Sequence, residues 1–423
     1  MALPIVKTKK YKVHALGCRT NQYEAQAFKD QLAELGYEEA LEHEEADLCI
    51  VNTCTVTESA DSSSRHVVRD FIRKNPSAKV IATGCLAERD PKSLGTIEGV
   101  TKVVSNKDKE KLIEELFPDL DVSEFSIKNF DAHTRAFVKV QDGCNSFCTY
   151  CIIPYVRGRS RSRPMDEILK EIEGLVATGF KEVVLTRINI GDFDGGDGKV
   201  KLCDLVREVD QIQGLERIRV SSIDPDEVDE NLQNAILLGK KTCPSMHLVL
   251  QAGSNMVLKR MNRKYTRQIF LETVRRLKDA CPDFTVTTDV IVGFPGETES
   301  DFQETLDVIS EVEFAKIHMF PYSERPRTKA ATYTNKVPHD VIAKRKSEVL
   351  RLAEKVAYSL REKYIGRKMT ILTEEASQEG MLSGHTANFL PVIIPKGNFT
   401  TNELVEVELI ENSPQGLIGK VIL

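Results

Sequence analysis

The chain has 423 residues, more than one hydrophobic core usually organises, so we expect two or three domains. Hydrophobic residues make up 41% of it and charged residues 29%, and the absence of an apolar run of about 18 residues argues against a membrane protein. The formal net charge of -6 argues against broad electrostatic capture of nucleic acid, so any RNA contact has to use local patches.

The N-terminal segment MALPIVKTKK leads into the first expected strand without an apolar signal core or a cleavage site. This pattern predicts a cytoplasmic protein. The ten cysteines are therefore interpreted as metal ligands or buried thiols, because a chain of this size has no need of a disulfide framework.

Residues 1–125 are expected to form one α/β domain, because strand-like and helix-like segments alternate along them. KYKVHALGC precedes NQYEAQAFKDQLAELGY, DLCIVNTC precedes ESADSSSRHVVRDFIRKN, and AKVIATGC precedes a further helix-like segment. The alternation predicts a flavodoxin-like parallel sheet with helices on its faces.

Three of these strands end in a cysteine, namely Cys18, Cys54 and Cys85. Parallel strands end at one edge of a sheet, where ligands of open α/β sheets bind, so the three thiols are expected to converge. One such cysteine alone is more often a buried core residue, but the recurrence in three successive units favours a ligand site. Structural roles are expected for the remaining cysteines outside the motif below: Cys49, Cys203, Cys243 and Cys281.

Residues 130–362 are expected to form an incomplete (β/α)6 barrel with its active site at the C-terminal ends of the strands. The strand-like segments are RAFVKVQ, KEVVLT, RIRVSS, SMHLVLQ, FTVTTDVIVG and AKIHMF, separated by amphipathic helix-like segments. A helix from about His339 to Lys363 leads to residues 363–423, where short strands alternate with Gly, Pro and Asn. That last pattern predicts a small antiparallel β-barrel.

The strongest motif is QDGCNSFCTYCIIP, which places Cys144, Cys148 and Cys151 in C-x3-C-x2-C spacing. Closely spaced thiolates suit an iron-sulfur cluster. With three local ligands, a four-iron cluster keeps one iron open for a small bidentate ligand. Zinc is the rival interpretation, but structural zinc normally takes four ligands and no second pair follows.

A basic segment follows the motif directly. In RGRSRSRP the four arginines alternate with other residues, so in an extended segment they would share one face and contact S-adenosylmethionine or RNA, whereas the alternative is a solvated basic loop. The four residues are Arg157, Arg159, Arg161 and Arg163. Further along, the glycines of GFPGE, from Gly293 to Glu297, are expected to let the backbone approach a ligand.

Over essentially its whole length the sequence resembles the radical S-adenosylmethionine superfamily, and within it the methylthiotransferases. The resemblance rests on the C-x3-C-x2-C run, the upstream LGC, NTC and TGC cysteines, RGRSRSRP, GFPGE and FPYSERP. LGCRTNQYEAQ and RAFVKVQDGCNSFCTYCIIPYVRGRSRSRP look most similar to the MtaB-type tRNA methylthiotransferases. The resemblance implies an N-terminal methylthiotransferase domain, a radical barrel and a C-terminal TRAM domain.

The resemblance also implies a division of labour between two 4Fe-4S clusters. Cys144, Cys148 and Cys151 would hold the cluster that cleaves S-adenosylmethionine to a 5′-deoxyadenosyl radical, while the three strand-end cysteines would hold an auxiliary cluster that carries sulfur. A second S-adenosylmethionine would donate the methyl group. Candidate residues around the S-adenosylmethionine pocket are Asn189, Ser222, Gln251 and Gly293.

The implied substrate is N6-threonylcarbamoyladenosine next to the tRNA anticodon, converted to its 2-methylthio form. A flavodoxin or ferredoxin-type reductant and a sulfur donor are implied partners, and Asn388, Phe389 and Phe399 are candidates for RNA contact in the TRAM domain. Two alternatives remain open: methylthiolation of a protein aspartate, as in the RimO type, and a non-catalytic iron-sulfur protein that binds RNA or senses redox state.

Overall fold

The N-terminal domain is a parallel α/β sheet, as predicted. The computed structural model describes residues 8–131, 133–378 and 380–422. Five parallel strands lie in the order β2-β1-β3-β4-β5, which is the flavodoxin-like order. The strands are β1 (Lys10–Ala15), β2 (Glu38–Glu39), β3 (Leu48–Thr53), β4 (Lys79–Gly84) and β5 (Val100–Val103), and the helices are α1 (Arg19–Glu34), α2 (Glu58–Lys74), α3 (Cys85–Arg89), α4 (Pro91–Gly95) and α5 (Leu112–Leu116).

The second domain is the expected incomplete barrel. Two three-stranded parallel sheets are joined by bridges from Ile218 to Thr242 and from Ile223 to Leu248, giving the order β6-β9-β10-β11-β12-β13. The strands are β6 (Arg135–Lys139), β9 (Glu182–Thr186), β10 (Arg217–Val220), β11 (Ser245–His247), β12 (Thr285–Val292) and β13 (Lys316–Pro321). Within the described residues β6 and β13 do not pair with each other, so the barrel has an open side.

Helices surround this barrel. The helices on the outside are α7 (Met165–Ala177), α8 (Leu202–Gln211), α9 (Glu230–Leu238), α10 (Asn255–Arg260), α11 (Arg267–Ala280), α12 (Glu299–Val312) and α13 (His339–Glu362). The cysteine motif lies between β7 (Gln141–Asp142) and α6 (Ile153–Val156), and the short β8 (Arg161–Ser162) pairs with β7. The motif is thus at the C-terminal end of the first barrel strand, as the sequence predicted.

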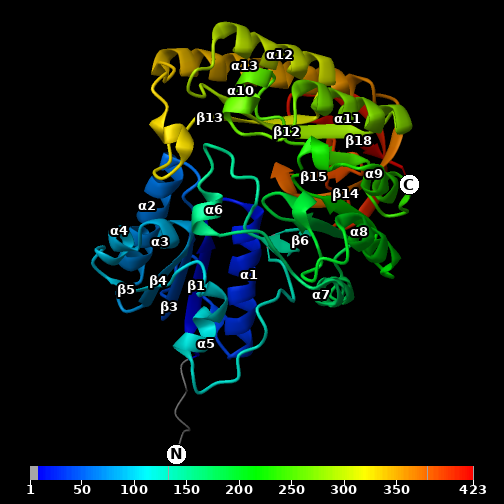
Figure 1. Cartoon of the computed structure of the whole chain (residues 1–423). Helices are drawn as coiled ribbons and strands as arrows, with labels where there is room; N and C mark the ends of the chain where they lie inside the picture. The colour runs from blue at the N-terminus through cyan, green and yellow to red at the C-terminus, as the bar shows by residue number, and fades with distance from the viewer. Residues whose placement is uncertain (1–7, 132, 379, 423) are drawn as a thin grey trace, which may run out of the picture.

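The N-terminal domain covers the open side of the barrel. Its helix α1 lies between its own sheet and β6 (Figure 1), and Tyr23 donates a hydrogen bond to Glu171 of α7 at 2.7 Å. On the other edge, the Arg325 guanidinium beyond β13 pairs with Asp61 of α2 at 2.7 Å. These contacts bring the sheet edge that carries the strand-end cysteines towards the barrel interior.

The C-terminal domain is a closed five-stranded barrel in the order β14-β15-β16-β18-β17. Its strands are β14 (Lys368–Gln378), β15 (Met381–Thr386), β16 (Pro391–Pro395), β17 (Leu404–Asn412) and β18 (Leu417–Val421). The turn after β15 packs against the N-terminal ends of the larger barrel's strands, where the Arg219 guanidinium donates to the carbonyls of Thr386 and Ala387. The small barrel therefore closes the end of the large barrel opposite the cysteine motif.

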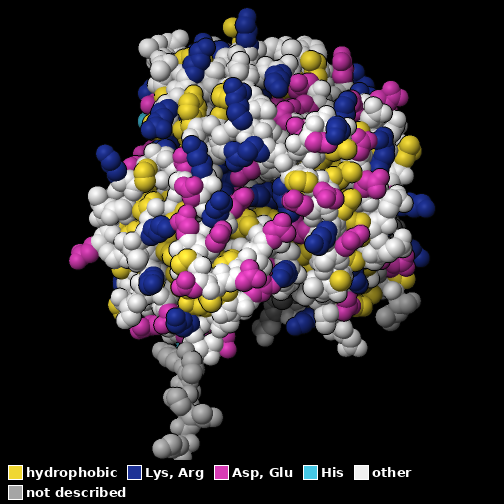
Figure 2. All heavy atoms as spheres, turned by 60° about the horizontal axis from the view of Figure 1, so that its bottom comes forward, with side chains coloured by type: hydrophobic (Ala, Val, Ile, Leu, Met, Phe, Trp, Pro, Cys, Tyr) yellow, Lys and Arg dark blue, Asp and Glu magenta, His cyan; other side chains and the backbone are white. Residues whose placement is uncertain are grey.

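Two further features concern the hydropathy of the helices and the distribution of charge on the surface. No described helix combines the length and apolar character needed to cross a bilayer. On the face drawn in Figure 2, positive and negative side chains are intermixed, and Lys and Arg side chains gather around the recess near its middle. The recess is thus a place where positive side chains are concentrated in a chain of net negative charge.

Candidate active site

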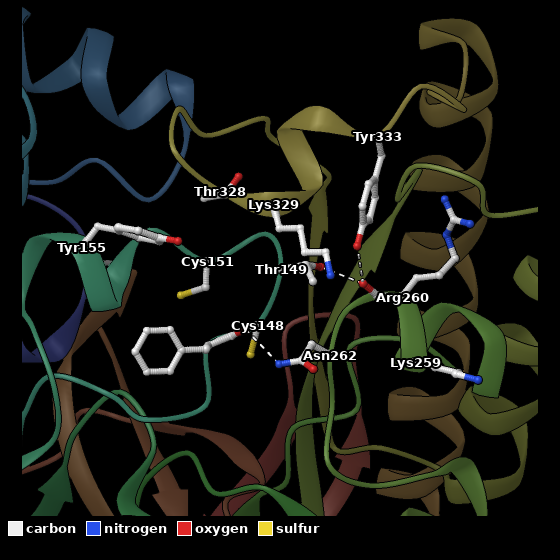
Figure 3. A pocket seen from close by; sticks show the side chains of 11 residues that line it. Cys148, Thr149, Cys151, Tyr155, Lys259, Arg260, Asn262, Thr328, Lys329 and Tyr333 are labelled. Carbon is white, nitrogen blue, oxygen red and sulfur yellow. Dashed lines mark hydrogen bonds between the residues drawn. The ribbon is translucent and has the colours of Figure 1, made fainter.

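The motif cysteines lie in a tightly folded loop at the mouth of the barrel. Phe147 adopts a left-handed conformation, with φ of 48°, and its carbonyl accepts a hydrogen bond from the Asn262 amide at 3.1 Å. The hydroxyl of Thr149 donates to the carbonyl of Arg260 at 2.8 Å. Figure 3 shows the Cys148 and Cys151 sulfurs beside a cavity of about 290 Å³ that these contacts border. The loop is thus anchored on α10 and the turn that follows it.

A buried ion pair supports Cys148. The Arg263 guanidinium lies 2.9 Å from the Cys148 sulfur and also pairs with the Asp224 carboxylate. Burial raises the pKa of the Cys148 thiol, and the positive charge of Arg263 opposes that rise. Burial also raises the pKa of Cys151, with Cys148 contributing as a neighbouring thiolate. Arg263 therefore favours the thiolate form that an iron ligand requires.

The three strand-end cysteines also converge. Cys18 is the N-cap of α1, Cys54 follows β3, and Cys85 begins α3 directly after β4. Burial, together with the neighbouring Cys85 and Cys18, raises the pKa of Cys54 to about 12. A Cβ on Gly17 would lie 2.6 Å from the Cys54 sulfur, so the LGC glycine permits this approach. The thiols share a common site.

The donor atoms of the two trios limit which metal centre each could hold. Among the described residues, no three His, Cys, Asp or Glu side chains are arranged to hold one metal ion. Each trio supplies three sulfurs of the same type, which is the donor set of an iron-sulfur cluster with one open iron.

The two trios adjoin each other. Cys85 and Cys144 belong to one buried apolar cluster with Ile152, Ile153 and Val156 of the motif loop. A second cavity, of about 190 Å³, lies between the domains. Its lining includes Val56 and Thr57, shortly after Cys54, as well as Cys151, Ile153 and Ile291 from the barrel side. A planar apolar group in this cavity would contact both cysteine-bearing regions.

Buried polar groups without partners surround the motif. Within the described residues, Asn189 Nδ2 and Gln251 Oε1 have no hydrogen-bond partner, and neither do Nε and Nη1 of Arg187. Arg187 lies at the end of β9, near Cys144, and donates to the Gly143 carbonyl at 2.9 Å. Such unsatisfied groups fit a polar ligand such as S-adenosylmethionine. Of the sequence candidates for that pocket, Asn189 and Gln251 have this character, and Ser222 is half-buried at the end of β10.

Gly293 has a different reason to be glycine. With φ of 76°, a Cβ there would lie 2.4 Å from Ile342 of α13, so the close neighbour is that helix. A Cβ on Gly296 would meet the Arg260 guanidinium at 2.6 Å. The GFPGE turn is thus closely packed against α10 and α13, and the expectation that its glycines let the backbone approach a ligand stays a prediction. Its Glu297 accepts from the Gly293 amide at 2.6 Å and pairs with Arg345 at 2.8 Å.

The arginine segment does not present one face. Arg157 is completely buried and donates to Glu24 at 2.9 Å and to Asp142 at 2.8 Å, so it is a bridge between the domains and has no surface free for RNA. Arg163 pairs with Glu171 at 2.6 Å. Arg159 and Arg161 remain exposed. The prediction of a shared contact face is wrong for the first residue because the chain turns at α6 instead of remaining extended.

Asn388 and Phe389 are also placed differently from the expectation. Asn388 is 1% exposed, and its amide donates to the Asp283 carbonyl at 3.1 Å. The Phe389 ring stacks on His385 with 4.7 Å between centroids and lies under the Arg219 guanidinium. Both residues lie where the two barrels meet. Asn388 is not available for RNA, whereas Phe389 is half-buried. Phe399 is half-buried against the core of the small barrel.

Several site residues carry no local signal in the sequence. Arg263 and Asp224 come from segments far from the motif and meet it only in the folded chain, because Arg263 contacts both Asp224 and Cys148. Burial and the nearby Asp224 carboxylate raise the pKa of Glu227 to about 7. In the sequence, only two segments hinted at these residues: RMNRKY, and SSIDPDE directly after a barrel strand. Barrel topology alone places the latter at the active-site end.

Comparison with known proteins agrees with this geometry. The Radical SAM superfamily model matches residues 138–309, and the model of the uncharacterized protein family UPF0004 matches residues 10–105. Among solved structures, the radical S-adenosylmethionine methyltransferase TsrM from Kitasatospora setae, with cobalamin and a [4Fe-4S] cluster bound, has a TM-score of 0.55 at 14% identity. The match covers 89% of this chain and 80% of that one, and supports the fold.

Full-length relatives are also known. The threonylcarbamoyladenosine tRNA methylthiotransferase MtaB of Chlamydia pneumoniae is 50% identical over 97% of this chain and 98% of its own length. The MtaB of Bacillus subtilis (strain 168) is 38% identical over 94% and 93%. A tRNA-2-methylthio-N(6)-dimethylallyladenosine synthase of Acetivibrio thermocellus is 34% identical over 99% and 92%.

Proposed function

Because the chain belongs to the MtaB family of radical S-adenosylmethionine tRNA methylthiotransferases, we propose that it converts N6-threonylcarbamoyladenosine next to the tRNA anticodon to its 2-methylthio derivative. The observation that supports this most is the identity of 50% to an MtaB over nearly the whole of both chains. Both cysteine trios and all three domains fall within that match.

Two 4Fe-4S clusters form part of the proposal. One cluster, when bound, supplies an electron for S-adenosylmethionine cleavage, and its ligands are Cys144, Cys148 and Cys151. The other cluster, bound by the strand-end cysteines, supplies sulfur. The chain's own groups hold these partners in place: Arg263 stabilises the Cys148 thiolate, and Arg187, Asn189 and Gln251 offer unsatisfied polar atoms. The apolar walls of the cavity between the domains would exclude water from the reacting base.

A local surface beside the motif suits RNA. Phe147 and Tyr155 are exposed aromatic side chains, and the Arg159 guanidinium lies 4.2 Å from the centroid of the Phe147 ring. Lys259 and Lys329 are exposed on the rim of the same cavity (Figure 3). Aromatic faces stack on unpaired bases and lysines contact phosphates, which is how single-stranded RNA loops are bound.

The reaction requires further partners. A flavodoxin or ferredoxin-type protein would deliver the electron, and a separate donor would replace the sulfur used in each turnover. A tRNA substrate also places the proposed activity in the cytoplasm. These assignments follow from the chemistry of the proposed reaction, since both an electron and a sulfur atom are consumed.

The direct test is nucleoside mass spectrometry of tRNA from a strain that lacks the gene, with and without the gene restored. We expect 2-methylthio-N6-threonylcarbamoyladenosine to be found only after restoration. Unmodified N6-threonylcarbamoyladenosine in both strains would contradict the proposal. A protein aspartate as the substrate would then be tested by mass spectrometry of ribosomal proteins from the same strains.

A further inference from the structure

Arg19 enters the barrel through its open side. It follows Cys18 directly and is the first residue of α1, in the domain that covers the gap between β6 and β13. Its guanidinium lies 5.2 Å from the centroid of the Phe137 ring on β6. It lines a small hollow of about 90 Å³ together with Arg135, Phe137, Arg219, His247, His318 and Phe389.

Arg19 differs from the neighbouring arginines because they already have carboxylate partners. Arg219 pairs with Glu182 at 2.6 Å, and Arg135 pairs with Glu374 at 3.0 Å. The Arg19 guanidinium makes no hydrogen bond or ion pair with any residue in the described ranges. Its side chain is accessible to water, although protein atoms lie around it.

The positive charge in the hollow is not fully compensated. Burial, followed by repulsion from Arg135 and Arg219, lowers the pKa of Arg19 to about 10, so the group remains a cation at neutral pH. Asp289 and Glu182 offset this repulsion in part, but Asp289 lies 3.4 Å from His247 and Glu182 already pairs with Arg219. An anionic ligand would relieve the repulsion between the guanidinium groups.

The hollow adjoins the cavity between the two cysteine trios. Asp289 lines that cavity, and His247, 3.4 Å away, lines the hollow. A ligand that extends past this pair would place an apolar ring near Cys151 and an anionic tail near Arg19. The N6-threonylcarbamoyl group has this form, because threonine is joined through its nitrogen and keeps a free carboxylate.

We propose that the Arg19 guanidinium binds the carboxylate of the substrate's threonylcarbamoyl group and so selects this base over adenosines whose N6 substituent is uncharged. The inference rests on the proposed function and adds a residue to it. A guanidinium presents two parallel N–H groups to a carboxylate, and the Phe137 ring beneath it restrains its plane. Arg19 acts in binding and takes no part in bond breaking.

The test compares two RNA probes on the full-length protein reconstituted with iron and sulfide. One anticodon stem-loop carries N6-threonylcarbamoyladenosine, and the other carries its methyl ester, which removes the negative charge and adds one methyl group. Affinities are measured for the original protein, Arg19→Gln, Arg19→Lys, and Arg69→Gln as a matched control on the exposed face of α2. Iron content and S-adenosylmethionine cleavage are measured for every protein.

We expect the original protein and Arg69→Gln to prefer the carboxylate probe by roughly 10- to 100-fold, the range for a charge-assisted contact. Arg19→Gln should reduce that preference to less than about 3-fold by losing affinity for the carboxylate probe alone, and Arg19→Lys should restore part of it. A variant that is misassembled would lose affinity for both probes and is recognised by its iron content.

Two results would overturn the inference: equal affinity of the original protein for both probes, or an unchanged preference in correctly assembled Arg19→Gln. Its failure differs from failure of the proposed function. If the original protein methylthiolates the carboxylate probe while Arg19→Gln still discriminates, only the role of Arg19 is lost. If the original protein modifies neither probe, the proposed function fails.

Discussion

The two cysteine trios reach similar arrangements by different routes. Cys144, Cys148 and Cys151 lie within eight residues of one loop, whereas Cys18, Cys54 and Cys85 come from three successive strand ends of a parallel sheet. The first trio depends on local chain geometry and the second on sheet topology. Damage to the sheet should therefore affect mainly the second trio, while damage to the loop should affect mainly the first.

The largest expected effect separates the trios by function. Cys148→Ala should abolish S-adenosylmethionine cleavage, because the motif loop has no spare ligand. Cys54→Ala should retain measurable cleavage but give no methylthiolated tRNA. Cleavage is measured as 5′-deoxyadenosine formation after anaerobic reconstitution and reduction. Equal loss of cleavage in the two variants would contradict separate roles.

The next effect concerns the buried charges that join the trios. Glu24 is fully buried and contacts Arg157 at 2.9 Å and Lys109. Glu24→Gln should reduce the free energy of unfolding by about 3–5 kcal/mol, because the cations lose their partner. Chemical denaturation measures this, and Glu34→Gln on the exposed face of α1 should cost less than about 1 kcal/mol. Similar losses in both variants would argue against the network.

The same carboxylate predicts acid sensitivity. Burial opposes ionisation of Glu24, but Arg157, Lys109 and Lys139 outweigh it and lower its pKa from 4.5 to about 2. Since the pKa in the folded state is below that in the unfolded state, the stabilisation is complete above about pH 4.5 and is lost as the pH falls towards 2. In unfolding curves across this range, Glu24→Gln should show a weaker pH dependence than the original protein. An equal dependence would exclude Glu24 as its source.

A smaller effect tests the sheet edge alone. Gly17→Ala places a Cβ 2.6 Å from the Cys54 sulfur and also strains a backbone with φ of 89°. Gly36 also has a left-handed backbone, with φ of 80°, but a Cβ there would have no neighbour within 4 Å. Gly36→Ala is therefore a matched control for the backbone strain alone, which costs about 1 kcal/mol. We expect Gly17→Ala to lose iron from the second trio and keep cleavage activity. Full iron content in Gly17→Ala would show that the contact is not needed.

The smallest effect tests the loop. Arg263→Gln removes the positive charge 2.9 Å from the Cys148 sulfur. Hydrogen bonds and positive charge at cluster sulfurs raise the reduction potential, so this variant should have a lower midpoint potential with the cluster still bound. Electron paramagnetic resonance during redox titration measures it. An unchanged midpoint would mean that Arg263 does not act on this cluster.

Much of the molecule was readable from local patterns. The six strand-like segments of the barrel, the alternation in residues 1–125 and the closed C-terminal barrel are all present. In each case, the spacing of apolar residues within a segment indicates whether one face or both faces of that segment are buried. The convergence of Cys18, Cys54 and Cys85 could also be inferred, because parallel strands share one edge.

Other features were decided by tertiary packing. Arg157 and Phe389 look like surface contacts in sequence, yet Arg157 is buried between domains, and the half-buried Phe389 packs where the two barrels meet. Gly293 is glycine because α13 packs against it. Arg19 becomes noteworthy only because the N-terminal domain covers an open barrel side.

The sequence by itself determined the elements, the cysteine motif and the family, since these depend on periodicity and spacing within short segments. Only the tertiary structure decided which charges are paired, which aromatic rings are exposed and which cations face a hollow. The physical reason is that burial and pairing depend on residues distant in the chain, and no local pattern records those neighbours.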